Sequence, residues 1–218
     1  MSLTGERPTA VVYVDGFNLY RRALQSTRYK WLDLSRMSDL LLPKFDVVQV
    51  RYFTARIRMQ THKPQSPQRQ QAYLRAISAD PRVSMHFGQF RIDQREMQRH
   101  PLELDEAGQP ILVKVRKFEE KGSDVNLATH LLSDAFQNAA AAFVVLTNDS
   151  DLAEPMRLLR HDWGKTVGLI TPGHTTSKAL LAAGPQIILQ LREGVLQESQ
   201  FPDLVRDGHG AVKRPDTW

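Results

Sequence analysis

The chain has no cysteine among its 218 residues. This absence excludes disulfides, cysteine-ligated zinc, iron–sulfur clusters and thiol nucleophiles, and it suits the reducing cytoplasm. No apolar run approaches the ~20 residues that span a bilayer, and the first residues lack the apolar stretch of a signal peptide. Motifs of the G-x-G-x-x-G or P-loop type are also missing. We therefore expect a cytoplasmic protein that has neither a membrane partner nor a nucleotide cofactor.

Acidic residues are absent from one long stretch, Arg51–Arg75, although the chain carries 24 of them. Basic side chains are frequent in this stretch, and more of them lie between Arg91 and Lys117. The formal net charge of the whole chain is +5. A basic rim around acidic motifs suits a bound polyanion. A charge run of this kind is as often a solvated cationic surface.

Apolar, β-branched segments alternate with helical patterns along most of the chain. Strand patterns cover residues 10–15, 46–54, 83–90, 142–147, 166–170 and 186–191, and helical patterns cover 18–25, 34–42, 68–78, 124–138, 151–160 and 175–183. This alternation predicts an α/β fold with a mostly parallel central sheet and helices on both faces. We expect one domain over residues 1–200, a hairpin insertion at about 91–117, and a flexible tail at 201–218.

Aspartates stand where strand patterns end or helical patterns begin. Asp15 ends the first strand pattern, Asp149 and Asp151 follow the fourth, and Asp124 begins a helix. Right-handed crossovers bring such junctions to one edge of a parallel sheet, where ligands bind. Carboxylates gathered there repel one another unless a cation lies among them. We therefore expect Asp15, Asp124 and Asp149 to lie within reach of one Mg²⁺ site, suited to phosphodiester chemistry.

Each of these segments also has a purely structural interpretation. The plausible helix caps are Asn18, Ser123, and either Asp149 or the serine after it. An acid in the first turn of a helix interacts favourably with the helix dipole. Capping, however, requires only one of the two acids Asp149 and Asp151. Asp124 also heads the apolar stripe of its helix, whereas an acid that serves only the dipole would point to solvent.

The order and spacing of these segments resemble the NYN domain family, a branch of the PIN-like metal-dependent ribonucleases. The matching segments are Asp15-Gly16-x-Asn18, Glu120-Lys121-Gly122-Ser123-Asp124-Val125-x-Leu127-Ala128, and Asn148-Asp149-Ser150-Asp151-Leu152 followed by Gly164-Lys165-x-Val167. The resemblance runs from about Val11 to Leu191. It implies a Rossmann-like, three-layer α/β/α sandwich, one or two Mg²⁺ or Mn²⁺ ions in an acidic site, and the cleavage or binding of RNA.

Applied residue by residue, the resemblance implies metal ligation by Asp15, Asp124, Asp149 and Asp151, with Asn18 as a polar helper in catalysis. The chain departs from many relatives at two positions. It has His130 where they have an acid, and Asn148 where they have a glycine. The first departure removes a carboxylate from the surroundings of the site.

The combined prediction is a metal-dependent ribonuclease that hydrolyses RNA with metal-activated water. The candidate phosphate contacts are basic residues that flank the motifs: Arg56, Arg58, Lys63, Arg69, Lys117 and Lys121. Two other classes stay open. One is an RNA-binding or regulatory module with a vestigial acidic site, and the other is a haloacid-dehalogenase-like phosphatase, which needs an aspartate where this chain has Phe17. Assembly into a homo-oligomer stays open as well.

Overall fold

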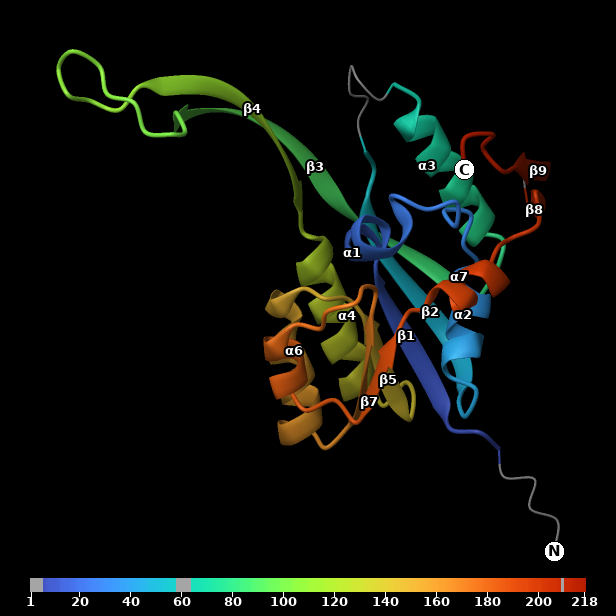
Figure 1. Cartoon of the computed structure of the whole chain (residues 1–218). Helices are drawn as coiled ribbons and strands as arrows, with labels where there is room; N and C mark the ends of the chain where they lie inside the picture. Colours follow the sequence, from blue (N-terminus) through green and yellow to red (C-terminus); the bar gives the residue numbers. More distant parts are fainter. Residues whose placement is uncertain (1–5, 58–63, 209) are drawn as a thin grey trace, which may run out of the picture.

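The computed structural model describes residues 6–57, 64–208 and 210–218 (Figure 1). Within these ranges, the largest sheet has seven strands in the order β4-β3-β2-β1-β5-β6-β7. The strands are β1 (Thr9–Asp15), β2 (Asp46–Ala55), β3 (Val83–Gln98), β4 (Leu112–Lys121), β5 (Ala142–Leu146), β6 (Thr166–Thr171) and β7 (Ile187–Gln190). Neighbouring strands are parallel except β3 and β4, which are antiparallel.

Helices cover both faces of this sheet (Figure 1). They are α1 (Gly16–Leu19), which continues into the π-helical η1 (Tyr20–Leu24), α2 (Leu34–Leu41), α3 (Ser66–Ile77), α4 (Ser123–Phe136), η2 (Ser150–Leu152), α5 (Ala153–Arg157), η3 (Leu158–Asp162), α6 (Lys178–Ala182) and α7 (Glu193–Glu198). Two apolar clusters fill the space between the layers, and the side chains of β1 alternate between them. The predicted α/β fold with a mostly parallel sheet is confirmed. No helix of the described ranges is long and apolar enough to cross a bilayer.

The central strands β1 and β5 explain where ligands can bind. Both are almost entirely buried and consist mainly of apolar residues, as expected for strands covered on both faces. The chain leaves β1 toward β2 on one side and leaves β5 toward β6 on the other. Helices that start from adjacent strands in opposite directions leave a crevice at the carboxyl edge between them. Asp15 ends β1 at this crevice, and Asp149 follows β5.

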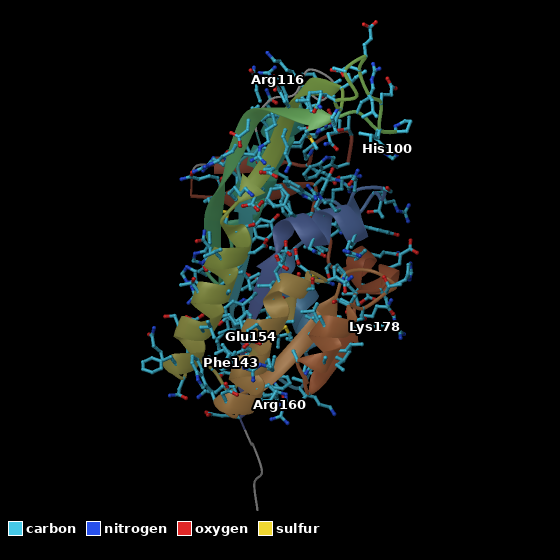
Figure 2. All side chains as sticks on the ribbon, turned by 90° about the vertical axis from the view of Figure 1, so that its left-hand side faces the viewer. His100, Arg116, Phe143, Glu154, Arg160 and Lys178 are labelled. Carbon is cyan, nitrogen blue, oxygen red and sulfur yellow. The ribbon has the colours of Figure 1, made fainter. Side chains whose placement is uncertain are left out.

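The predicted hairpin is longer than the sequence suggested. Strand β3 does not end at Phe90 but continues to Gln98, paired with β4 from Gln89↔Lys121 to Gln98↔Leu112. This ribbon projects from the body of the molecule, and Arg116 and His100 lie on its outer part (Figures 1 and 2). No turn residue interrupts β3 at position 90, so the strand runs on into the hairpin.

The sequence predicts a flexible tail at 201–218, but the structure packs much of this segment against α3. Strands β8 (Leu204–Asp207) and β9 (Gly210–Lys213) form a second, two-stranded sheet. Asp207 forms an ion pair with Arg75 of α3 at 2.8 Å. The ring of Trp218 lies 6.0 Å from that of Tyr73 and 6.2 Å from that of Trp31. A few apolar side chains spaced among polar ones anchor this segment, which composition alone does not show.

Candidate active site at the carboxyl edge of the sheet

An acidic cleft of about 470 Å³ lies at the crevice beside β1. Its described lining includes five carboxylates, from Asp15, Glu119, Glu120, Asp124 and Asp149, and three cations, from Arg21, Arg22 and Lys121. Phe17, Asn18 and Ser123 complete the lining. The three sequence segments that carry the aspartates therefore meet in one place, as the analysis of strand ends predicted.

Asp15 is only 5 % exposed, and two hydrogen bonds hold its carboxylate in place. Its carboxylate accepts hydrogen bonds from the backbone N–H of Asn18 and from the hydroxyl of Thr147, each at 2.9 Å. Burial raises the pKa of Asp15, these two hydrogen bonds oppose the rise, and the charges of Asp149 and Glu120 add to it. The capping interpretation of Asn18 is wrong, because Asp15 caps α1. The Asn18 side chain instead accepts a hydrogen bond from the Asn148 N–H at 3.2 Å, which joins two of the motifs.

Asp124 lies in the first turn of α4, and Glu120 shapes the start of that helix. The backbone N–H and the hydroxyl of Ser123 donate to the two carboxylate oxygens of Glu120 at 2.9 and 2.7 Å. Ser123 is thus not the predicted cap; the cap position is Gly122, whose φ of 94° suits glycine. Sequence reasoning quoted Glu120 within the motif but assigned it no role.

The half-buried carboxyl of Asp124 reports the electrostatics of the cleft. Burial and then the charges of Asp15, Asp149, Glu120 and Asp151 raise its pKa from 3.8 to about 6. Like charges at short range disfavour the ionised form, and a cation reverses that preference. The lining of this cleft therefore concentrates negative charge more than its own cations offset.

Asp149 and Asp151 have different positions. Asp149 caps η2, accepts from the Asp151 N–H at 3.1 Å, and donates its own N–H to the Thr147 hydroxyl at 3.0 Å. Thr147 thus orients both Asp15 and Asp149, a role that the sequence analysis missed. Asp151 is exposed and is not among the described residues that line the cleft. Asn148 accepts from the Ser177 N–H at 2.7 Å and fixes the segment that precedes α6.

The donor set suits a hard cation, with one restriction. Among the described residues, no group of three or more histidine, aspartate or glutamate side chains lies close enough to hold one ion. The expectation that Asp15, Asp124 and Asp149 all lie within reach of one ion is therefore not met in this arrangement. Mg²⁺ commonly keeps several waters and takes only one or two carboxylates. The cleft, lined by carboxylate oxygens, fits such a hydrated ion rather than a closed cage.

The basic residues predicted to contact phosphate already have partners within the protein where the structure describes them. Lys117 and Lys121 both form ion pairs with Glu119, the second at 3.3 Å. The guanidinium of Arg56 lies 4.8 Å from the ring centre of Phe87 and donates to Gln71.

Arg69 donates to the hydroxyls of Ser66 and Thr217 and lines a second cavity. Arg58 and Lys63 lie outside the described residues. Sequence reasoning missed Arg21 and Arg22, which line the cleft, because a single pair of arginines on a helix carries no distinctive pattern.

His130 packs against His86 and Phe53, away from the cleft motifs. Its ring lies 4.0 Å from that of His86 and 5.7 Å from that of Phe53. Burial, the charge of His130 and the charge of Arg51 lower the pKa of His86 to about 4. Burial and the charge of Arg51 also lower the pKa of His130.

Comparisons with known proteins agree with this architecture. The NYN domain model matches residues 9–191. The chain is 26 % identical, over 236 aligned residues, to the 6-hydroxy-3-succinoylpyridine 3-monooxygenase of Pseudomonas putida, with 95 % of this chain and 74 % of that protein covered. It is also similar to the crystal structure of a protein of unknown function from Vibrio parahaemolyticus, with a TM-score of 0.53 and 12 % identity over 88 % of this chain and 98 % of that one. At that identity the structural likeness shows the fold alone.

Proposed function

The chain belongs to the NYN domain family, and we propose that it is a ribonuclease that hydrolyses RNA with the help of Mg²⁺ or Mn²⁺. The observation that carries this proposal is the acidic cleft, where Asp15, Asp124 and Asp149 from three separate motifs line one cavity. The pKa of Asp124, raised to about 6 by burial and by neighbouring carboxylates, agrees with this concentration of charge. The carboxylates of the cleft would repel a phosphodiester, and a bound cation would offset that repulsion. Perturbed carboxyls in a cleft are also a general mark of functional sites.

In this proposal Asp124 and Asp149 hold the hydrated ion. Asp15, held by Thr147, either binds the ion as well or attracts it through its negative charge. A bound Mg²⁺ or Mn²⁺ supplies water of lowered pKa and neutralises charge on the phosphate. Arg21 and Arg22, on the helix that follows Asp15, place positive charge at the same cleft for the phosphates that flank the scissile bond.

The RNA-binding module with a vestigial site remains the alternative within the same family. Such a module would bind RNA through the same basic residues as the nuclease and would differ only in not cleaving it. The phosphatase is disfavoured, because the position where its chemistry needs a second aspartate is Phe17, whose ring lies 6.4 Å from that of Phe90.

A second candidate comes from the relative named as a monooxygenase of a succinoylpyridine. The observation that favours it is the second cavity, of about 290 Å³, which is lined by aromatic rings and cations and suits a small aromatic acid. This candidate leaves the acidic cleft without a role. It predicts consumption of such an acid, with dioxygen and a reductant, by an Asp149→Asn variant as well as by the native protein.

The deciding experiment is a cleavage assay on single-stranded RNA and DNA with Mg²⁺, Mn²⁺ or EDTA. We expect cleavage of RNA that needs the metal and is lost in Asp149→Asn. The matched control is Asp216→Asn, which neutralises an aspartate whose side chain is 86 % exposed in the tail. Cleavage that persists in EDTA or in Asp149→Asn would refute the metal mechanism. RNA binding without cleavage in any metal would favour the regulatory module.

A further inference from the structure

The second cavity has the composition of a site for an aromatic anion. Six aromatic side chains line it, from Phe17, Tyr20, Tyr52, Tyr73, Phe90 and Trp218, and we call it the aromatic pocket. Its described lining also includes Arg21, Lys30 and Arg69, and contains no aspartate or glutamate. The acidic cleft, by contrast, has five carboxylates in its lining. Two adjacent cavities of opposite charge suit different parts of one ligand.

Helix α1 and the start of η1 separate the two cavities. Phe17 and Arg21 belong to the lining of both. This segment lies directly on β2, because a Cβ at Gly16 would come within 2.7 Å of the Tyr52 hydroxyl and of the Phe53 carbonyl oxygen. Glycine at this position therefore lets the start of α1 approach β2 closely, which places Phe17 on the boundary between the cavities. A ligand in the aromatic pocket lies one short helix away from the carboxylates.

We propose that the aromatic pocket binds one unstacked base of the RNA strand whose phosphate lies in the acidic cleft. The inference rests on RNA being the substrate, as proposed above. The rings of Phe17 and Phe90 are 6.4 Å apart and inclined by 49°, and both side chains are half-buried rather than sealed in the core. The guanidinium of Arg21 lies 6.0 Å from the ring centre of Phe17. Aromatic faces and arginine planes of this kind stack on bases that are splayed out of a single strand.

The cations at the pocket suit the phosphate of the nucleotide whose base enters it, and the phosphate in the acidic cleft is then a neighbouring one of the same strand. Arg69 is oriented by hydrogen bonds to Ser66 at 3.2 Å and Thr217 at 3.0 Å, and Lys30 donates to the backbone carbonyl of Thr27. The pKa of Lys30 is lowered by burial and by the positive charge of Arg69, so the two cations repel each other mildly. An anion between them would remove that repulsion. A volume of about 290 Å³ suits a ligand of nucleotide size rather than a longer segment.

A base subsite in this pocket therefore predicts that the protein prefers single-stranded RNA to paired RNA. A paired base remains inside its stack and cannot enter, whereas an unpaired base enters at the cost of unstacking alone. Stacking tolerates every base, so we expect a preference for strandedness with little preference for sequence.

The test is an abasic scan by equilibrium binding in EDTA, which does not depend on cleavage. A short single-stranded RNA carries one abasic residue at each position in turn, and its affinity is compared with that of the intact RNA. We expect one position at which the native protein loses roughly 5- to 150-fold in affinity, the range for one stacked base. Phe90→Ala should lose a similar factor on intact RNA and should show no further loss at that abasic position.

The control variant is Phe136→Ala, which removes an aromatic ring that is 77 % exposed at the end of α4. Its affinity for intact RNA, and its loss of affinity at each abasic position, should match those of the native protein. Should Phe90→Ala fail to fold, as judged by circular dichroism, Lys30→Gln serves instead. This variant should have a lower affinity for both intact RNA and a free nucleoside monophosphate.

A flat scan in the native protein, or a Phe90→Ala loss that adds fully to the abasic loss, would overturn the base subsite. A pyridine carboxylic acid that binds more tightly than a nucleoside monophosphate, with RNA affinity unchanged in Phe90→Ala, would also overturn it and assign the pocket to a small acid. The two proposals fail separately. Metal-dependent cleavage with a flat scan refutes the pocket alone, whereas a position-specific scan without cleavage refutes the nuclease alone.

Discussion

Two aspartates of this protein are almost equally buried and have opposite surroundings. Asp134 in α4 is 6 % exposed, and Asp15 at the end of β1 is 5 % exposed. Asp134 accepts hydrogen bonds from the Arg51 guanidinium at 2.6 and 2.9 Å and from the Tyr13 hydroxyl at 2.7 Å. Among the described residues, Asp15 accepts only from a hydroxyl and a backbone N–H and forms no ion pair.

The difference separates structural from functional charge. The charge of Asp134 is offset by a cation of the same chain, so the group ties α4 to β1 and β2 and offers nothing to a ligand. Asp15 is held in place by dipoles while its pKa is raised by burial and by nearby acids. A fixed carboxylate without an internal counter-charge is prepared for a cation from outside. Burial alone therefore says little about function, whereas the identity of the partners says much.

The largest expected effect is on stability, in Asp134→Ala. This change leaves the Arg51 charge and the Tyr13 hydroxyl without their shared partner, and breaking a buried pair costs about 3–5 kcal/mol. Urea unfolding at pH 7 measures the loss. Asp216→Ala, which breaks an exposed pair with Lys213, should change stability by less than about 0.5 kcal/mol. A loss below about 1 kcal/mol in Asp134→Ala would remove the contrast between the two aspartates.

The next effect is on chemistry, in Asp149→Asn. We expect metal-dependent RNA cleavage to fall at least about 100-fold, since a ligand that stabilises transition-state charge contributes several kcal/mol and each tenfold corresponds to 1.36 kcal/mol. Stability should change little, because asparagine caps a helix as well as aspartate does. Single-turnover cleavage and thermal unfolding are measured on the same preparation. Unfolding of the variant would show that Asp149 is chiefly a structural cap.

Local patterns predicted most of the elements up to β7, but not α7, β8 or β9. They also predicted the meeting of the aspartate motifs, because strand ends of a parallel sheet face one edge. They could not predict the partner of Asp134, since Arg51 lies 83 positions away in sequence. They also predicted Ser123 as the cap of α4, a role in which its side chain would accept a hydrogen bond from the helix. Ser123 instead donates hydrogen bonds to Glu120. Side-chain direction and long-range contact decide these features, and neither is written in the spacing of residues.

The aromatic pocket shows the same limit. Phe17, Phe90 and Trp218 come from three distant segments, and each has the appearance of an ordinary core residue in sequence. The long β3 and the packed tail bring them together, and the sequence analysis expected a shorter strand and a flexible tail. The acidic half of the site was therefore predictable, because its carboxylates are costly to bury, whereas the apolar half was not.

A smaller effect sharpens the electrostatic side of the comparison, in Asp124→Asn. The folded-state pKa of Asp124, about 6, is above its ordinary value of 3.8, so the folded protein holds an extra proton between these pH values. Stability therefore falls as pH rises through this window. Without metal, the variant should be more stable by about 1 kcal/mol above pH 6, a figure reduced for solvent screening of this half-buried group. The difference should vanish below about pH 4, and Mg²⁺ at pH 7 should stabilise the native protein more than the variant. Thermal unfolding from pH 4 to 8 tests both statements.

The smallest effect concerns the cations at the edge of the cleft. Arg21 and Arg22 line it and form no ion pair with any described residue, whereas Lys117 is already paired with Glu119. A cation that releases counterions from single-stranded RNA contributes about 0.7 to the slope of log affinity against log salt. We expect Arg21→Gln and Arg22→Gln each to reduce the slope by about that amount. Lys117→Gln should reduce it by clearly less, because the Lys117 ammonium already has Glu119 as its counter-charge and so neutralises less of the RNA charge. Fluorescence anisotropy with a short labelled RNA, measured from about 50 to 200 mM salt, gives the slopes. Equal slopes for all three variants would mean that internal pairing does not decide which cations meet the phosphate, and the distinction between occupied and open charges would then hold for the aspartates alone.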